Sequence, residues 1–170
     1  MFLSTGAVDG IATLVQPWAT FYADRQWLQT IIMFAHLAAI FLGGGFAMAT
    51  DRDTFIAVRD ARLSGHIRHL GRLRTIHKPV MLGLMLALGS GFLLYLADIE
   101  HFNGSPVFWI KMALLAALLG NGYLLKRTEE TLSTGKQDAP HLWDRLWKIS
   151  VASMVFWLAV ILSGTLLAGE

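Results

Sequence analysis

Apolar residues along this chain are gathered into four long blocks separated by polar stretches. The blocks cover residues 27–49, 79–97, 106–125 and 146–168. Each approaches or exceeds the ~20 residues that a helix needs to cross ~30 Å of hydrocarbon. Helix is expected because backbone groups in lipid must be hydrogen-bonded within their own segment. A soluble bundle would keep a polar stripe on every helix, and these blocks lack one. The pattern predicts an all-α fold, an integral membrane four-helix bundle formed by residues 1–170 as one domain.

The segment before the first block, residues 1–26, also has apolar residues at helical spacing. Pro17 should break that pattern, and several aromatic residues follow it. Aromatic side chains favour the membrane–water boundary. We therefore expect an N-terminal interfacial helix that leads into the first span, with a lid over a site near His36 as the alternative.

Residues 51–78 repeat leucine and isoleucine every three or four positions among arginines and histidines. This spacing predicts a basic amphipathic helix on the cytoplasmic surface, or a cytoplasmic extension of the second span. Pro79 suits the first turn of that span. His66 and His69 have the spacing of a metal pair but no third ligand, so a solvated basic face is the favoured interpretation.

The basic residues also predict topology. Seven lie between the first two blocks, four lie between the last two with Lys148 following in the first turn of the fourth block, and residues 98–105 contain none. By the positive-inside rule both basic connections are cytoplasmic and both termini lie outside, which suits a multi-pass protein of a bacterial inner membrane. Topology thus explains the net charge of +2 without a nucleic-acid partner. The absence of cysteine excludes disulfides and thiolate chemistry.

Small residues recur on one face of each block, which lets membrane helices approach closely. The sets are Ala39, Gly43 and Ala47; Gly83, Ala87, Ser90 and Gly91; Ala113, Ala116, Ala117 and Gly120; and Ser150, Ser153 and Gly164. We expect these faces to be helix–helix contacts. Asn121 should form a hydrogen bond between helices.

His36 lies well inside the first block, about nine residues or ~13 Å from its outer end. An imidazole at that depth costs free energy unless it has a hydrogen-bond partner or a metal. Two interpretations stay open. The ring is bonded to a neighbouring serine, tyrosine or carbonyl, or it is an axial ligand of haem iron.

Lys111 lies at a similar depth in the third block. Its long stem can lift the ammonium to the headgroups, or the ammonium can pair with a carboxylate-bearing ligand such as a haem propionate. Lys111 is roughly opposite the small-residue face of its own helix, so a shared pocket would have the lysine at its edge. No second histidine matches the depth of His36, which leaves Met33, Met112 or water for a sixth ligand position.

A wider pattern connects these residues. His36 is followed by Gly43-Gly44 and Asp51-Arg52, the second span ends SGFLLY at 90–95, and the third begins SPVFWIK at 105–111. Over residues 27–125 the chain resembles an uncharacterised bacterial four-helix membrane-domain family. It is more distantly similar to copper-resistance protein D-type domains and HemJ-type protoporphyrinogen oxidases. The HemJ-type resemblance implies a b-type haem, with His36 and Lys111 as functional residues.

We therefore expect an inner-membrane protein that binds haem b or a porphyrin, with His36 as the metal ligand and Lys111 near the propionates. It would transfer electrons or act on a porphyrin or quinone near the periplasmic face. The alternative is a non-catalytic transmembrane subunit or assembly partner of a larger membrane complex. A cation transporter has less support, because no carboxylate lies inside the four blocks.

Overall fold

The structure, a computed structural model, describes residues 5–59, 63–134 and 139–169, with side chains except at 5–9, 63–70, 72–75 and 77. The described ranges form six helices: α1 Thr5–Ala23, α2 Gln26–Arg59, α3 Leu63–Ala97, α4 Ile99–Gly104, α5 Pro106–Ser133 and α6 Pro140–Leu167. The all-α fold is confirmed.

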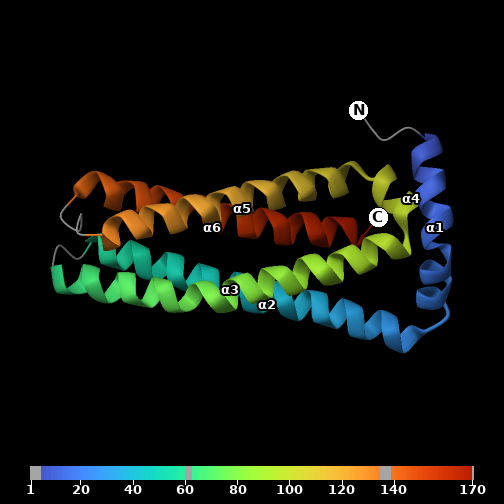
Figure 1. The fold of residues 1–170 in the computed structure, drawn as a ribbon, viewed down its shortest axis with the longest axis horizontal. Helices are drawn as coiled ribbons and strands as arrows, with labels where there is room; N and C mark the ends of the chain where they lie inside the picture. Colours follow the sequence, from blue (N-terminus) through green and yellow to red (C-terminus); the bar gives the residue numbers. More distant parts are fainter. Residues whose placement is uncertain (1–4, 60–62, 135–138, 170) are drawn as a thin grey trace.

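Four of the helices run side by side as two antiparallel hairpins (Figure 1). Helix α2 packs against α3 and α5 packs against α6, while contacts between α2 and α6 join the hairpins. Each of the four contains a stretch long and apolar enough to cross a membrane. Large side chains such as Phe34, Phe41 and Leu82 are exposed on the outside of the bundle. Such a surface suits lipid, so the structure is that of a multi-pass membrane bundle.

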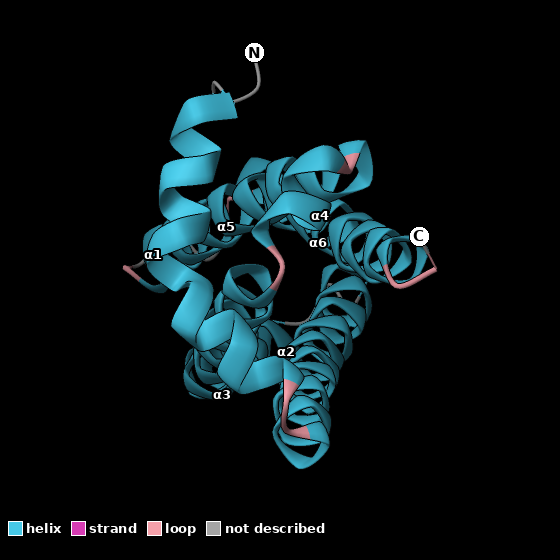
Figure 2. Cartoon of the chain, turned by 90° about the vertical axis from the view of Figure 1, so that its right-hand side faces the viewer, coloured by secondary structure: helices cyan, strands magenta, loops and turns pink. Residues whose placement is uncertain are grey.

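Helix α1 lies across one end of this bundle, which we call the α1 end (Figures 1 and 2). Its Trp18 Nε1 donates a hydrogen bond to the carbonyl oxygen of Leu93 in α3 at 3.0 Å. The helix continues through Pro17, so the expected break there is wrong. At the same end Ser105 caps α5, its Oγ accepting from the Phe108 N–H at 3.3 Å, and Pro106 takes the first turn as the sequence predicted.

At the opposite end, which we call the far end, the helices run past the apolar blocks. Helix α2 has 34 residues and α3 has 35, about 51 Å at 1.5 Å per residue and well beyond the ~30 Å of hydrocarbon. A second core fills this extension, with Ala57, Leu132, Leu142, Trp143 and Leu146 buried. Residues 63–78 are thus continuous with the second span, which agrees with the alternative that they extend it and not with a separate surface helix. Pro79 lies inside this longer helix, so the prediction that it stands in the first turn is wrong.

Glycines set the distances between the helices in the middle of the bundle. A Cβ added to Gly83 of α3 would lie 2.7 Å from the Gly43 Cα of α2. Since real Cβ atoms do not approach backbone so closely, position 83 needs glycine, whereas a Cβ added to Gly43 would lie 3.4 Å from the Gly83 backbone, close to ordinary contact. The next residue, Gly44, faces α6, where an added Cβ would lie 3.0 Å from Cε3 of Trp157. The Gly43-Gly44 step therefore lets α2 pack against two helices at once.

The expected small-residue face of α5 does not pack within the bundle. Ala113, Ala116, Ala117 and Gly120 are all exposed, and a Cβ at Gly120 would meet nothing within 4 Å. Asn121 beside them is buried, and its Nδ2 donates to the carbonyl oxygen of Ile149 in α6 at 3.0 Å. The interhelical bond of Asn121 is thus confirmed, whereas the prediction that the face of α5 packs on another helix is wrong for this chain by itself.

The contact between Gly43 and Gly83 yields a stability prediction. Gly83→Ala should destabilise the bundle by about 1–3 kcal/mol, because the new methyl group forces α2 and α3 apart. Gly89→Ala, on the same helix but with nothing within 4 Å of its added Cβ, should leave stability unchanged or raise it by up to about 1 kcal/mol. Denaturant unfolding in detergent measures both, and equal effects of the two substitutions would contradict the packing argument.

Candidate functional site

The imidazole of His36 is held between α2 and α3. It is half-buried, and its Nδ1 lies 3.0 Å from the Oγ of Ser90. The Ser90 Oγ also lies 2.6 Å from the carbonyl oxygen of Leu86 and 3.2 Å from that of Ala87. These distances identify which partner donates each proton.

A serine hydroxyl has one proton, and a carbonyl oxygen can only accept. The short contact therefore means that the Ser90 hydroxyl donates its proton to the Leu86 carbonyl oxygen, within α3 itself. Towards His36 the Ser90 Oγ must accept, so Nδ1 carries the ring proton. The neutral imidazole then has its lone pair on Nε2, which is the nitrogen that would bind a metal or accept a proton.

Gly91 makes room for the ring. A Cβ added at Gly91 would lie 3.0 Å from the Cε1 of His36 and 3.5 Å from its Nδ1. The imidazole thus lies against bare α3 backbone, and this contact together with the bond to Ser90 fixes its orientation. Ser90 and Gly91, which the sequence suggested only as packing residues, are the two neighbours that position the candidate ligand.

Lys111 of α5 lies at the same height along the bundle axis as His36, and we call such a height a level. Helix α6 runs antiparallel to α2, and Gly44 of α2 faces the ring of Trp157 in α6. His36 lies eight residues before Gly44, and Gly164 lies seven after Trp157, so the two belong to one level. A Cβ at Gly164 would be 3.5 Å from the Nζ of Lys111. The half-buried Lys111 is close enough to repel a protonated His36 electrostatically.

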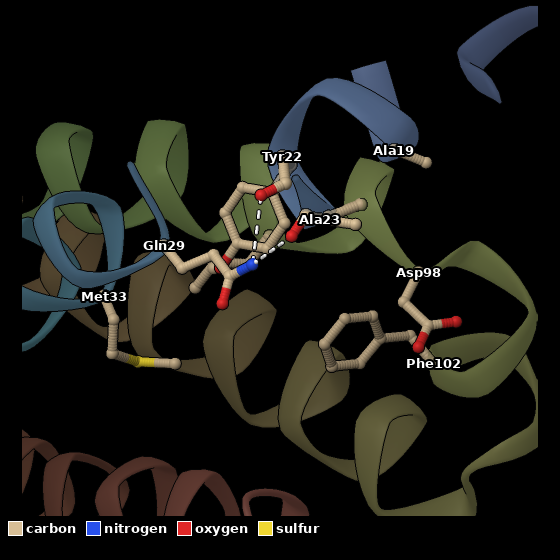
Figure 3. Close-up of a pocket in the computed structure, with 9 residues that line it drawn as sticks. Ala19, Tyr22, Ala23, Gln29, Met33, Asp98 and Phe102 are labelled. Atoms are coloured by element: carbon tan, nitrogen blue, oxygen red, sulfur yellow. Dashed lines mark hydrogen bonds between the residues drawn. The ribbon is translucent and has the colours of Figure 1, made fainter. Parts of the chain in front are cut away.

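A pocket of about 340 Å³ opens next to this level at the α1 end (Figure 3). Its lining comes from α1, α2, α3 and α4: Ala19, Tyr22, Ala23, Gln29, Met33, Leu94, Ala97, Asp98 and Phe102. Met33 lies one helical turn from His36, and Leu94 one turn from Ser90. Neither His36 nor Lys111 lines the pocket. It therefore lies about one helical turn beyond the imidazole and does not enclose it.

Helix α1 forms one wall of that pocket. Gln29 of α2 holds the C-terminal end of α1 in place, because its Nε2 donates to the carbonyl oxygens of Tyr22 at 3.1 Å and Ala23 at 3.0 Å (Figure 3). Burial raises the pKa of the Tyr22 phenol above its ordinary value of 10.0, so this group stays neutral at physiological pH. The pocket is mainly apolar, with a carboxylate, Asp98, at its edge.

Among the described side chains, no other histidine completes a metal site with His36. His101 of α4 is exposed and packs edge-on against Phe102, with 5.4 Å between ring centroids. The side chains of His66, His69 and His77 lie outside the described part of the chain. Within the described residues no group of three His, Asp or Glu side chains could hold a metal ion. A single imidazole suits an iron whose other ligands come mainly from a porphyrin.

A second level of buried polar side chains, which the sequence did not predict, lies nearer the far end. Asp51 of α2 is only 2 % exposed, and Ser150 of α6 is 0 % exposed. Hydropathy places Asp51 just beyond the first apolar block, where a carboxylate would be solvated. A signal was present, since Asp51 continues the buried face of Gly43 and Ala47 at intervals of four residues.

No protein-family model matches this chain, and no curated protein or solved structure matches it either.

The bond between His36 and Ser90 makes a spectroscopic prediction. Nitrogen-15 NMR of the histidine-labelled protein in detergent should show the Nδ1–H tautomer for His36, because Ser90 offers only an acceptor to that nitrogen. Ser90→Ala should move His36 towards the Nε2–H form that is common for free imidazole. His101, which is exposed, is the internal control, and an Nε2–H tautomer of His36 in the unsubstituted protein would contradict the assignment.

Proposed function

We propose that this chain is an inner-membrane protein that binds haem b or a related porphyrin through the Nε2 of His36. The observation that carries the proposal is the bond from His36 to Ser90. Histidines that ligate metals usually donate their other ring N–H to a fixed acceptor, which sets the tautomer and the ring orientation. Ser90 supplies such an acceptor, and the absence of a side chain at Gly91 lets the ring lie against α3 in the orientation that makes this bond.

Lys111 supports the same proposal, because it brings a positive charge to the level of the imidazole. A porphyrin has an apolar ring and anionic propionates, so it needs a ligand to the metal, apolar walls and a cation at the rim. His36, the apolar pocket beside it and Lys111 correspond to these three needs. Lys111 would pair with a propionate and thereby offset the cost of keeping its ammonium in apolar surroundings.

Haem at this position supplies one-electron redox chemistry. With the basic connections on the cytoplasmic side, the α1 end faces the periplasm. His36 would then hold the haem in the outer half of the membrane. Transfer of electrons at the periplasmic face is the role that this depth favours, and α1 would cover the site from the aqueous side.

A visible absorption spectrum tests this proposal. The protein purified in detergent after expression with a haem precursor should show a Soret band that shifts on reduction, and His36→Ala should abolish it. Ser90→Ala should weaken haem affinity by about 10- to 100-fold, as is usual for a residue that orients a metal ligand. Lys111→Met should weaken affinity without removing the axial ligand.

His101→Ala is the matched control, since this histidine is exposed at the same end of the bundle. Its spectrum should equal that of the unsubstituted protein. A folded protein that stays colourless when reconstituted with haem, or a Soret band that survives His36→Ala unchanged, would refute the proposal.

The exposed small-residue face of α5 favours a second candidate, a non-catalytic subunit of a larger membrane complex. Glycine and alanine at this spacing usually let another helix approach closely. Gly43, Gly44 and Gly83 of α2 and α3 lie against a neighbouring helix in this way, whereas Gly120 meets nothing within 4 Å. A partner helix would give this face the contact that the isolated bundle does not.

Gly120→Leu tests this second candidate. It should leave the thermal stability of the purified chain unchanged but reduce the size of the complex seen by native electrophoresis of solubilised membranes. Gly45→Leu is the control, because Gly45 of α2 is also exposed with nothing within 4 Å of an added Cβ. An unchanged complex in Gly120→Leu, or the same loss in both variants, would count against the α5 face.

A further inference from the structure

The second polar level, between α2 and α6, is independent of His36. Asp51 lies seven residues after Gly44, and Ser150 lies seven before Trp157. Because Gly44 faces Trp157 and the helices are antiparallel, Asp51 and Ser150 lie at one level, ~10 Å from that contact. The carboxyl of Asp51 faces the hydroxyls of Ser150 and Ser153 across the two helices.

Two oxygens at this level are buried without a partner. Asp51 Oδ2 and Ser150 Oγ have no hydrogen bond from any described residue. Asp51 is 2 % exposed and Ser150 is 0 % exposed, so bulk water does not reach these atoms. A buried oxygen without a partner costs about 1–3 kcal/mol, and a carboxylate costs more. The Ser150 hydroxyl can turn to donate to the carboxyl, but a hydrogen bond from a neutral group leaves the negative charge of a buried carboxylate unbalanced.

Two threonine hydroxyls near Asp51 in the sequence donate to their own helix. Thr50 Oγ1 donates to the carbonyl oxygen of Phe46 at 2.8 Å, and Thr54 Oγ1 donates to the carbonyl oxygen of Thr50 at 3.1 Å. The groups that face the carboxyl, the hydroxyls of Ser150 and Ser153, are neutral. They can donate hydrogen bonds, but they supply no counter-charge to a buried carboxylate.

We propose that Asp51, Ser150 and Ser153 bind a monovalent alkali cation. Carboxylate and hydroxyl oxygens are hard ligands, which suit alkali and alkaline-earth ions. One carboxylate neutralises a single positive charge. A divalent ion would keep a net positive charge in a medium where unbalanced charge is costly. Glu129, the other buried carboxylate described, lies eight residues beyond Asn121, two turns nearer the far end.

The cation site and the haem site are separate, so experiments can support or refute each one independently of the other. Trp157, only 3 % exposed and packed on Gly44, fills the level between them. A change at Asp51 should therefore leave a spectrum that depends on His36 unaltered, and a change at His36 should leave cation binding unaltered.

Thermal unfolding in detergent tests the proposal. The protein is purified in choline chloride and titrated with NaCl and, separately, KCl at constant ionic strength. At least one of these ions should raise the unfolding temperature in a saturable way, because a ligand that binds only the folded chain stabilises it in proportion to its occupancy. Asp51→Asn should abolish that rise, and Ser150→Ala should shift its midpoint to at least about tenfold higher concentration.

Ser163→Ala is the matched control. Ser163 is also a buried serine of α6, but its Oγ donates to the carbonyl oxygen of Val160 at 2.9 Å. Its titration should equal that of the unsubstituted protein. If Asp51→Asn does not fold, the unsubstituted protein and Ser150→Ala still decide, and binding of sodium-22 or of the potassium analogue rubidium-86 should saturate at one ion per chain.

Equal unfolding temperatures in sodium, potassium and choline salts would overturn the proposal in favour of a bridging water or a protonated carboxyl. Stabilisation by Ca²⁺ or Mg²⁺ at lower concentrations than by the alkali ions would overturn the assignment to a monovalent cation.

Discussion

The contact of bare backbone between Gly43 and Gly83 is the constraint on which the rest of this structure depends. Helices in lipid gain little from burying apolar surface against each other, so they associate where their backbones can approach closely. Here that approach places α2 on α3, and the adjacent Gly44 places α2 on Trp157 of α6. One dipeptide therefore fixes the register of α2 against both α3 and α6. A slip of one residue would insert a side chain where none fits.

That register decides which polar groups meet. Eight residues before Gly44, it brings His36 to Ser90 and to the level that Lys111 reaches near Gly164. Seven residues after Gly44, it brings Asp51 to Ser150. Trp157 fills the level between them with apolar volume. The chain thus has two polar levels separated by an apolar one, each made by residues that would be costly in lipid without their partners.

Much of the fold could be predicted from sequence because its signals are local. Block length gives four helices, Ser105-Pro106 gives the start of α5, and a single amide in an apolar block predicts the interhelical bond of Asn121. The helix ends at the far side could not be placed this way. Hydropathy reports contact with lipid, whereas the extension is stabilised by residues such as Leu132 and Trp143, which are buried by protein.

The site was predictable only in part, for a related reason. Depth in a block identifies His36 and Lys111, but spacing alone cannot tell which helix each faces. Ser90 looked like a packing residue because small side chains serve both packing and hydrogen bonding. Asp51 looked solvated because the sequence does not show that α2 continues, packed against α6, beyond the apolar block. The polar partners depend on helix register, and register depends on contacts far apart in the chain.

Both proposed sites would balance a charge that the bundle holds in apolar surroundings. Lys111 brings a cation, and Asp51 an anion, into the same bundle on opposite sides of Trp157. They cannot neutralise each other, because about two helical turns of packed apolar side chains separate each from that level. A charge kept in such surroundings needs a counter-charge close by. An anionic ligand group would neutralise Lys111, and an alkali cation would neutralise Asp51. Both needs follow from the helix register that brings these two side chains into the bundle.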